Sequence, residues 1–207
     1  MTGFIAGFTL GLSLILVIGS QNAFLLRQGL KQEHVLTICL ICSISDALLI
    51  ISGVAGFSVI LLRTPWIETA ARYAGALFLM GYGARSFWMT FKAENFLKPS
   101  ADRNGSLALA ITTCLALTWL NPHVYLDTVI LLGSVSTQFP GQKVEFTSGA
   151  VLASFLFFHA LGFGARVLTP LLNKPASWRM LDFAIGLIMW SIAISLVKEH
   201  IQAFFDR

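Results

Sequence analysis

Two carboxylic acids lie far inside apolar stretches of this chain, Asp46 and Asp127. An acid at the centre of a membrane-spanning helix costs about 2.5 to 3.5 kcal/mol on insertion scales, and it is kept where it faces a cavity, a partner or an ion. At helical spacing Asp46 shares a face with Ser43, Ile50 and Gly53, and we expect this mostly small or polar face to look inward. The chemistry would be the binding of a cation or a proton. The alternative is a structural hydrogen bond to another helix.

A second cluster surrounds Asp127, because Asn121, Pro122, His123 and Tyr125 all lie within the same seven residues. Pro122 removes a backbone donor and breaks the helix. Backbone freed in this way can bind a substrate if it lines a cavity. His123 and Asp127 are four residues apart, so on a regular helix they share a face and can hydrogen-bond. The alternative is a kinked packing helix with an internal His–Asp pair.

Gln21 and Asn22 form a third candidate group, because their neutral amides could offer hydrogen-bond donors and acceptors to a substrate. They also lie near the end of an apolar run, where polar residues are ordinary. We interpret His159, a single histidine in an apolar stretch, as an interhelical hydrogen bonder rather than a ligand.

No further reactive or cofactor-binding constellation is present in the sequence. Cys39 and Cys42 have the spacing of a redox or zinc motif, but they lie in an apolar helix without a second Cys/His pair. There is no metal-ligand set, no nucleophile–base–orienter triad and no phosphate-binding glycine loop. We therefore expect no metal, no cofactor and no catalytic residue. Any uphill transport would draw on an ion gradient, since no ATP-binding domain is visible.

The elements that carry these residues must be membrane-spanning helices. Of the 207 residues, 56% are hydrophobic and only 12% are charged, whereas soluble domains carry roughly 25% charged residues. Residues 2–26, 104–126 and 146–165 contain no charged residue, and about 20 apolar residues suffice to cross a bilayer as a helix. The net charge of +4 comes from scattered residues and is no signal for nucleic acid.

We predict an all-α integral membrane protein of about six transmembrane helices in one domain, residues 1–207. A polar loop, residues 92–105, divides a first half, residues 1–91, from a second half, residues 106–207. Three helices per half would insert the second half upside down, as in transporters with a 3+3 inverted repeat. The first helix of each half is interrupted, at residues 19–22 (Gly-Ser-Gln-Asn) and at residues 121–122 (Asn-Pro). The predicted spans are residues 3–26, 35–62, 66–91, 107–132, 146–168 and 181–197.

Small residues and basic residues add two expectations. Gly3, Gly7 and Gly11 repeat every four residues, which would let another helix approach closely. Nine lysines and arginines fall on one side of the six-span arrangement and five on the other. By the positive-inside rule the first, third and fifth loops would be cytoplasmic and both termini outside.

Three stretches of the chain resemble the LysE-type exporters of basic amino acids. They are residues 19–24 (Gly-Ser-Gln-Asn-Ala-Phe), residues 45–46 (Ser-Asp) and residues 119–128 (Trp-Leu-Asn-Pro-His-Val-Tyr-Leu-Asp-Thr). The last stretch is specific and resembles the arginine exporter branch. The family often has proline where this chain has Ser20. The resemblance covers nearly the whole chain and implies export of arginine, with lysine or canavanine as further substrates, from a bacterial cytoplasm. It also implies roles for Asp46 and Asp127.

The sequence is compatible with three functions. The first is a multi-pass secondary exporter in the bacterial inner membrane, in which Asp46 or Asp127 binds the cation when ionised and releases it on exchange for a proton. The second is a membrane-embedded enzyme with His123 and Asp127 as an acid–base pair. The third is a passive channel or a structural subunit. We prefer the exporter, whose partners would be a basic amino acid, protons and the lipid bilayer; the sequence also allows a homo-oligomer.

Overall fold

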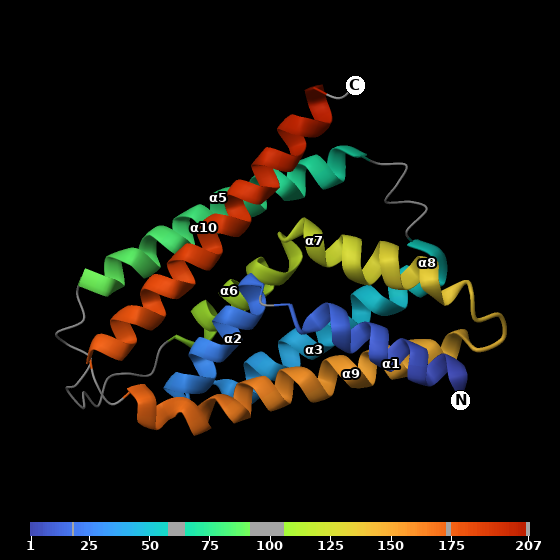
Figure 1. The fold of residues 1–207 in the computed structure, drawn as a ribbon, viewed down its shortest axis with the longest axis horizontal. Helices are drawn as coiled ribbons and strands as arrows, with labels where there is room; N and C mark the ends of the chain where they lie inside the picture. Colours follow the sequence, from blue (N-terminus) through green and yellow to red (C-terminus); the bar gives the residue numbers. More distant parts are fainter. Residues whose placement is uncertain (18, 58–64, 92–105, 173–174, 206–207) are drawn as a thin grey trace.

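The structure is a computed structural model that describes residues 1–17, 19–57, 65–91, 106–172 and 175–205. These described residues are helical throughout, with short connections and no strand (Figure 1). The expectation of an all-α protein is therefore confirmed for this part of the chain. The predicted polar loop, residues 92–105, lies outside the described residues.

The helices fall into two groups along the chain. The first group is α1 (Thr2–Ile15), α2 (Ser20–Lys31), α3 (Val35–Ser52), the π-helical turn η1 (Gly53–Phe57) and α5 (Pro65–Phe91). The second group is α6 (Leu107–Trp119), α7 (Pro122–Val124), the π-helical segment η3 (Tyr125–Leu131), α8 (Leu132–Ser136), α9 (Lys143–Gly164), the 3-10 helix η4 (Ala165–Leu172) and α10 (Pro175–Phe205).

Three stretches are long and apolar enough to cross a membrane, and two bent helix pairs extend this to as many as five spans. The three are Val35–Gly56, Lys143–Leu168 and Ala176–Lys198. The bent pairs are α1 with α2, and α6 with the segment from α7 to α8. The third predicted span, residues 66–91, falls on α5. Its 27 residues are long enough, but α5 is not among the helices that are sufficiently apolar. Six spans therefore stay a prediction.

Both bent pairs break where polar residues interrupt the apolar run. α1 and α2 meet at 79°, and the N-cap of α2 is Gly19 in an extended conformation. The second break bends by 60°, and here Asn121 is extended and Pro122 opens α7. A residue before proline is pushed out of the helical region, and proline suits the first position of a helix. Local sequence therefore produces the second break.

Glycines let the helices pack closely. Gly3, Gly7 and Gly11 are buried on one face of α1, as their four-residue spacing predicts. This face lies on α9, where a Cβ at Gly7 would overlap the carbonyl oxygen of Phe146. α5 and α10 lie alongside each other over most of their length (Figure 1).

α3 has two distinct faces. Ser43, Asp46 and Ile50 are buried, as expected, and so is Gly53 at the start of η1. The opposite face exposes a stripe of large apolar side chains, among them Leu36, Leu40, Ile44, Leu48 and Ile51. A helix that shows apolar side chains outward and polar ones inward is suited to lipid on its outer face. The acid at Asp46 therefore points into the bundle.

Candidate functional site

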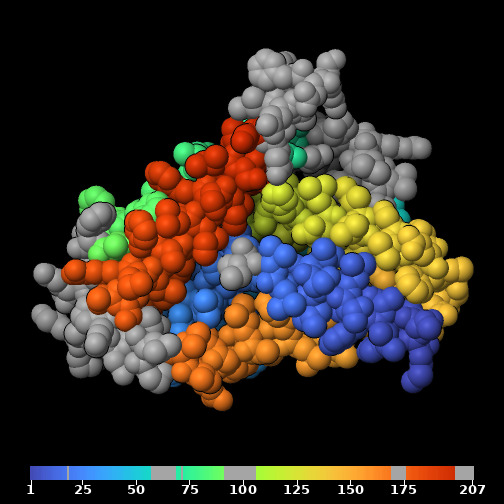
Figure 2. Space-filling view, viewed as in Figure 1, coloured from blue at the N-terminus to red at the C-terminus, as the bar shows by residue number. Residues whose placement is uncertain are grey.

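A cavity of about 400 Å³ lies where the two broken helices meet. Its walls come from the end of α1, the start of α2, α3, the break between α6 and α7, η3, α9 and α10. The space-filling view shows α1, α10 and the chain after Pro122 converging on one face (Figure 2). The volume is within the range of roughly 300 to 1,000 Å³ that is usual for small-molecule sites.

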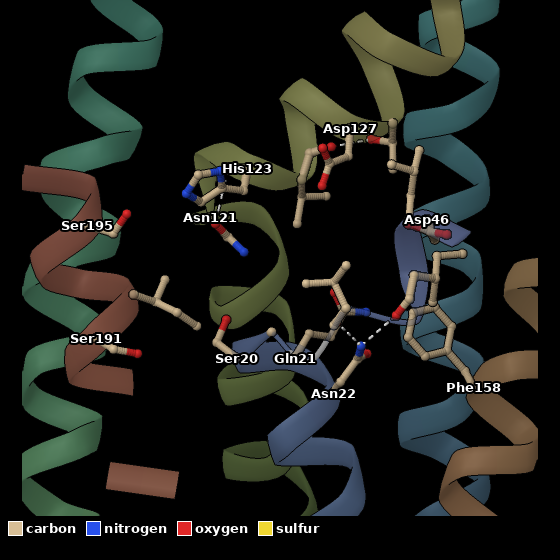
Figure 3. A pocket seen from close by; sticks show the side chains of 17 residues that line it. Ser20, Gln21, Asn22, Asp46, Asn121, His123, Asp127, Phe158, Ser191 and Ser195 are labelled. Carbon is tan, nitrogen blue, oxygen red and sulfur yellow. Dashed lines mark hydrogen bonds between the residues drawn. The ribbon is translucent and has the colours of Figure 1, made fainter. Parts of the chain in front are cut away.

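Six of the seven predicted site residues line this cavity, from four separate segments. Gln21 and Asn22 come from α2, and Asp46 comes from α3 (Figure 3). Asn121, His123 and Asp127 come from the second break and from η3. The structure thus brings together polar residues that the sequence places about 100 positions apart.

Tyr125, the seventh predicted site residue, does not line the cavity. Its hydroxyl donates a hydrogen bond to the carbonyl oxygen of Trp119 at 2.7 Å. In a continuous helix that carbonyl would accept from His123, but the backbone N–H of His123 donates instead to Asn121 Oδ1 at 3.2 Å. Tyr125 therefore satisfies a backbone group that the break at Pro122 sets free.

The expected hydrogen bond between His123 and Asp127 is absent among the interactions of the described residues. Tyr125–Leu131 is π-helical, with i→i+5 rather than i→i+4 hydrogen bonds. The side chains at positions 123 and 127 are therefore rotated relative to each other. They lie close enough to interact electrostatically, but the carboxylate of Asp127 is left facing the cavity (Figure 3).

Asp46 is surrounded by polar groups that also lack partners. Only 5% of Asp46 is exposed, and its Oδ2 atom has no hydrogen-bond partner among the described residues. The same holds for Gln21 Nε2, and for the hydroxyls of Ser20, Ser43 and Ser154. Ser154 on α9 is an electrostatic neighbour of the Asp46 carboxylate. Buried polar groups are nearly always paired with protein or with ordered water, so water or a polar ligand would satisfy this cluster.

Asn22 and Asn121 stabilise the two breaks as well as lining the cavity. The Asn22 side-chain amide donates to the carbonyl oxygens of Ile15 at 2.8 Å and Val17 at 2.9 Å, and so ties the end of α1 to α2. Asn121 uses its side-chain oxygen to cap α7. Gln21, by contrast, keeps an unpaired donor at the cavity.

Two other interpretations from the sequence need correction. His159 forms no hydrogen bond to another helix among the described residues, and its Nδ1 atom lies 2.8 Å from the carbonyl oxygen of Phe155, one turn earlier on α9. Arg27, which falls in the loop between the predicted spans 3–26 and 35–62, is not a loop residue in the structure. It lies within α2, is 9% exposed, and forms a 2.8 Å ion pair with Asp182 on α10. The two partners are far apart in the sequence, so no local pattern could reveal the pair.

Three serines of the cavity wall were not among the predicted site residues. Ser20 starts α2, and Ser191 and Ser195 lie one turn apart on α10 (Figure 3). Single serines in apolar helices are common, so the sequence offers no signal that separates these from others. Their position opposite Asp46 and Asp127 depends on how α10 packs.

Apolar helices, two of them broken around a polar cavity, define the class of a membrane transporter. The comparisons agree with this class. The family model described as LysE type translocator matches residues 12–200. The chain belongs to this LysE-type family and is therefore a multi-pass membrane transporter of amino acids, not an enzyme.

Similar proteins carry a more specific name. The chain is 39% identical over 206 residues to the Arginine exporter protein ArgO of Shigella flexneri and of Escherichia coli O157:H7, with 97% of each chain covered. It is 38% identical over 209 residues to the protein of the same name from Klebsiella pneumoniae subsp. pneumoniae, with 99% of each chain covered. No solved structure matches the chain.

Proposed function

We propose that this chain exports L-arginine from the cytoplasm across a bacterial inner membrane. The observation that carries the proposal is the pair of acids, Asp46 and Asp127, in one cavity, where neither forms an ion pair with a described residue. A guanidinium group is the cation best matched to carboxylates, because it can donate two parallel hydrogen bonds. The similar proteins named as arginine exporters support this choice of substrate.

The cavity also offers a place for the other end of an amino acid. The N-terminus of α2 opens at Gly19 and Ser20, which line the cavity, and it carries no side-chain cap. The positive end of a helix dipole attracts anions, and broken helices in transporters direct it at substrate carboxylates. We assign the α-carboxylate to this helix end and the guanidinium to the two acids. Lysine or canavanine would fit the same arrangement.

Proton exchange is the proposed source of energy. Moving one positive charge out of a negative cell costs about 2.3 kcal/mol per 100 mV. Exchange of one arginine for one proton cancels that electrical cost. Asp46 or Asp127 would hold the cation while ionised and release it on protonation.

We further propose that residues 1–91 and 106–207 are two inverted repeats in a single domain. A broken helix comes first in each half. The second part of each broken helix packs through a glycine on the end of the other half's second helix. Gly29 approaches the carbonyl oxygen of Gly162, and Gly133 approaches that of Gly53. α5 and α10, the last helices of the halves, pack on each other.

Efflux of labelled arginine from proteoliposomes tests the export function. With an inward proton gradient, the unaltered protein should release arginine uphill and with saturation. Asp46→Asn and Asp127→Asn should abolish gradient-driven efflux, whereas Glu145→Gln, which changes an exposed acid at the start of α9, should not. Efflux that is unchanged in both cavity variants would exclude this mechanism. Efflux that neither saturates nor runs uphill would indicate a passive channel.

A further inference from the structure

A buried ion pair lies beside the central cavity, and the proposed function does not use it. Arg27 Nη2 on α2 is 2.8 Å from Asp182 Oδ1 on α10. Arg27 Nη1 also donates to the Tyr82 hydroxyl on α5 at 3.3 Å. Asp182 is 1% exposed. The cluster of Arg27, Tyr82 and Asp182 therefore ties three helices together at one level of the bundle.

A second, smaller cavity of about 130 Å³ lies next to this cluster. Arg27 and Tyr82 are part of its wall, which also carries Lys31, Glu33 and Arg85. Its helices are α2, α5 and α6. It is thus a charged chamber, and it shares α2 with the central cavity.

The ion-pair cluster and one aromatic contact separate the two cavities. Along α2, Gln21 lines the central cavity and Arg27 the second one, and at 1.5 Å per residue they are about 9 Å apart. Phe24 lies between them along α2, is also part of the wall of the second cavity, and packs edge-to-face on Tyr82 with ring centroids 6.2 Å apart. Along α10, Asp182 precedes the cavity residue Ser191 by about 14 Å. The barrier is therefore only about two helical turns thick.

We propose that the Arg27–Asp182 pair, with Tyr82, is a gate between the two cavities, and that Asp182 is a second station for the cationic group of the substrate. This inference rests on the proposed arginine export. A buried ion pair is hard to separate, because each charge would be left without a partner. An incoming guanidinium removes that obstacle for Asp182, since it can replace Arg27 there with the same chemistry, and the α-carboxylate of the same substrate can pair with the released Arg27. Amino acids without a side-chain cation could not make this exchange, so the gate would select for basic substrates.

Accessibility of a cysteine in the central cavity tests the gate without measuring transport. The reporter is Ser191→Cys in a chain whose Cys39, Cys42 and Cys114 are replaced by alanine. A membrane-impermeant methanethiosulfonate reagent is applied to proteoliposomes from each side separately. With the pair intact, we expect labelling from one side only. Arg27→Gln and Asp182→Asn should each raise the labelling rate from the other side at least tenfold.

Two controls separate the gate from general loosening of the bundle. Arg85→Gln removes a cation of the second cavity that is not part of the ion-pair cluster, and it should label like the intact protein. The exchanged pair, Arg27→Asp with Asp182→Arg, should restore one-sided labelling. Equal labelling from both sides with the pair intact, or no change in either single variant, would overturn the proposal.

A measurement on the intact pair covers the case in which the single variants do not fold. Saturating arginine should accelerate labelling from the second-cavity side, and alanine at the same concentration should not. Tyr82→Phe, which keeps the ring and removes the hydrogen bond to Arg27, should accelerate labelling without any substrate. If Tyr82→Phe opens the barrier but arginine does not, the gate stands and the proposed substrate is wrong. If neither opens it, the gate is wrong.

Discussion

At the scale of single residues, three acids inside apolar helices meet three different environments. Asp46 is buried among polar groups without partners, and Asp127 is half-buried at the cavity wall. Asp182 is held by Arg27. The first two are thus free to bind a substrate or a proton, and the third is neutralised by a fixed partner until that partner is replaced.

Asp46→Asn should weaken arginine binding while leaving the fold intact. A hydrogen bond to a charged group contributes about 1.5 to 3 kcal/mol, so the half-saturating arginine concentration should rise about 10- to 150-fold. Thermal stability should be unchanged or higher, because a buried charge without a fixed partner is removed. Scintillation proximity binding and a thermal unfolding scan on the same sample measure both quantities. A fall in stability equal to the loss of binding would contradict a role in the site.

Asp182→Asn should lower the thermal stability of the protein, in contrast to Asp46→Asn. Removing one partner of a buried ion pair leaves the other charge uncompensated and costs about 3 to 5 kcal/mol. We expect a clear drop in the unfolding temperature that the double variant Arg27→Gln with Asp182→Asn partly recovers. Thermal unfolding of the purified single and double variants is the measurement. Independent, additive effects would show that the two side chains are not paired.

Tyr125→Phe tests whether Tyr125 stabilises the helix break or binds the substrate. The variant loses the hydrogen bond to the carbonyl oxygen of Trp119, which should lower stability by about 1 kcal/mol. The half-saturating arginine concentration should stay within twofold of the original value, since Tyr125 is not in the cavity wall. A large rise in that concentration with normal stability would place the hydroxyl at the substrate.

At the scale of helices, the site depends on two helix breaks. These breaks direct backbone and side-chain polar groups toward one cavity. The break at Pro122 follows from the chemistry of proline. The break before Ser20 has no proline, and there Asn22 holds the end of α1 by two hydrogen bonds. The first helix of each half is therefore broken and held in place by different residues.

Close helix packing at Gly53 should be intolerant of even one added carbon. A Cβ at Gly53 would overlap backbone atoms of Thr128 and Val129, so Gly53→Ala should destabilise the protein by about 1 to 3 kcal/mol. Gly81→Ala on α5 is the control, because no atom of the described residues lies within 4 Å of the new atom. This change should be neutral or stabilising by up to about 1 kcal/mol. Thermal unfolding of the two variants compares them, and equal effects would mean that η1 and η3 are not in contact at Gly53.

At the scale of the whole molecule, the substrate would join the two halves, because the cavity takes its wall from both. Binding to the folded state alone stabilises it, by about 2.7 kcal/mol at a ligand concentration 100 times the dissociation constant. Arginine should therefore raise the unfolding temperature, and alanine should not. The rise should be lost in Asp46→Asn. A rise of equal size with alanine would show a general solvent effect instead of site binding.

The number of membrane spans also belongs to the whole molecule. Six spans put both termini on one side of the membrane, whereas five put them on opposite sides. The difference lies in whether α5, which carries the buried Arg72, crosses the bilayer as a span of its own. Labelling of a cysteine added at each terminus, from each side, decides between the two arrangements.

The sequence by itself determined the class of structure and most of the candidate site. Long apolar helices, the acids Asp46 and Asp127, and the break at Pro122 are consequences of local composition, which any arrangement of the helices must accommodate. Lipid makes these signals strong, since each polar group inside an apolar helix needs a reason to be there.

Only the tertiary structure decided which polar groups face each other. It paired Arg27 with Asp182, brought Ser191 to the cavity and placed Tyr125 outside it. These outcomes depend on how helices distant in the sequence are rotated against one another, and π-helical turns such as η3 change that rotation by a fraction of a turn. Periodicity read along a single helix assumes regular geometry and contains no information about the neighbour, so it could not have supplied these contacts.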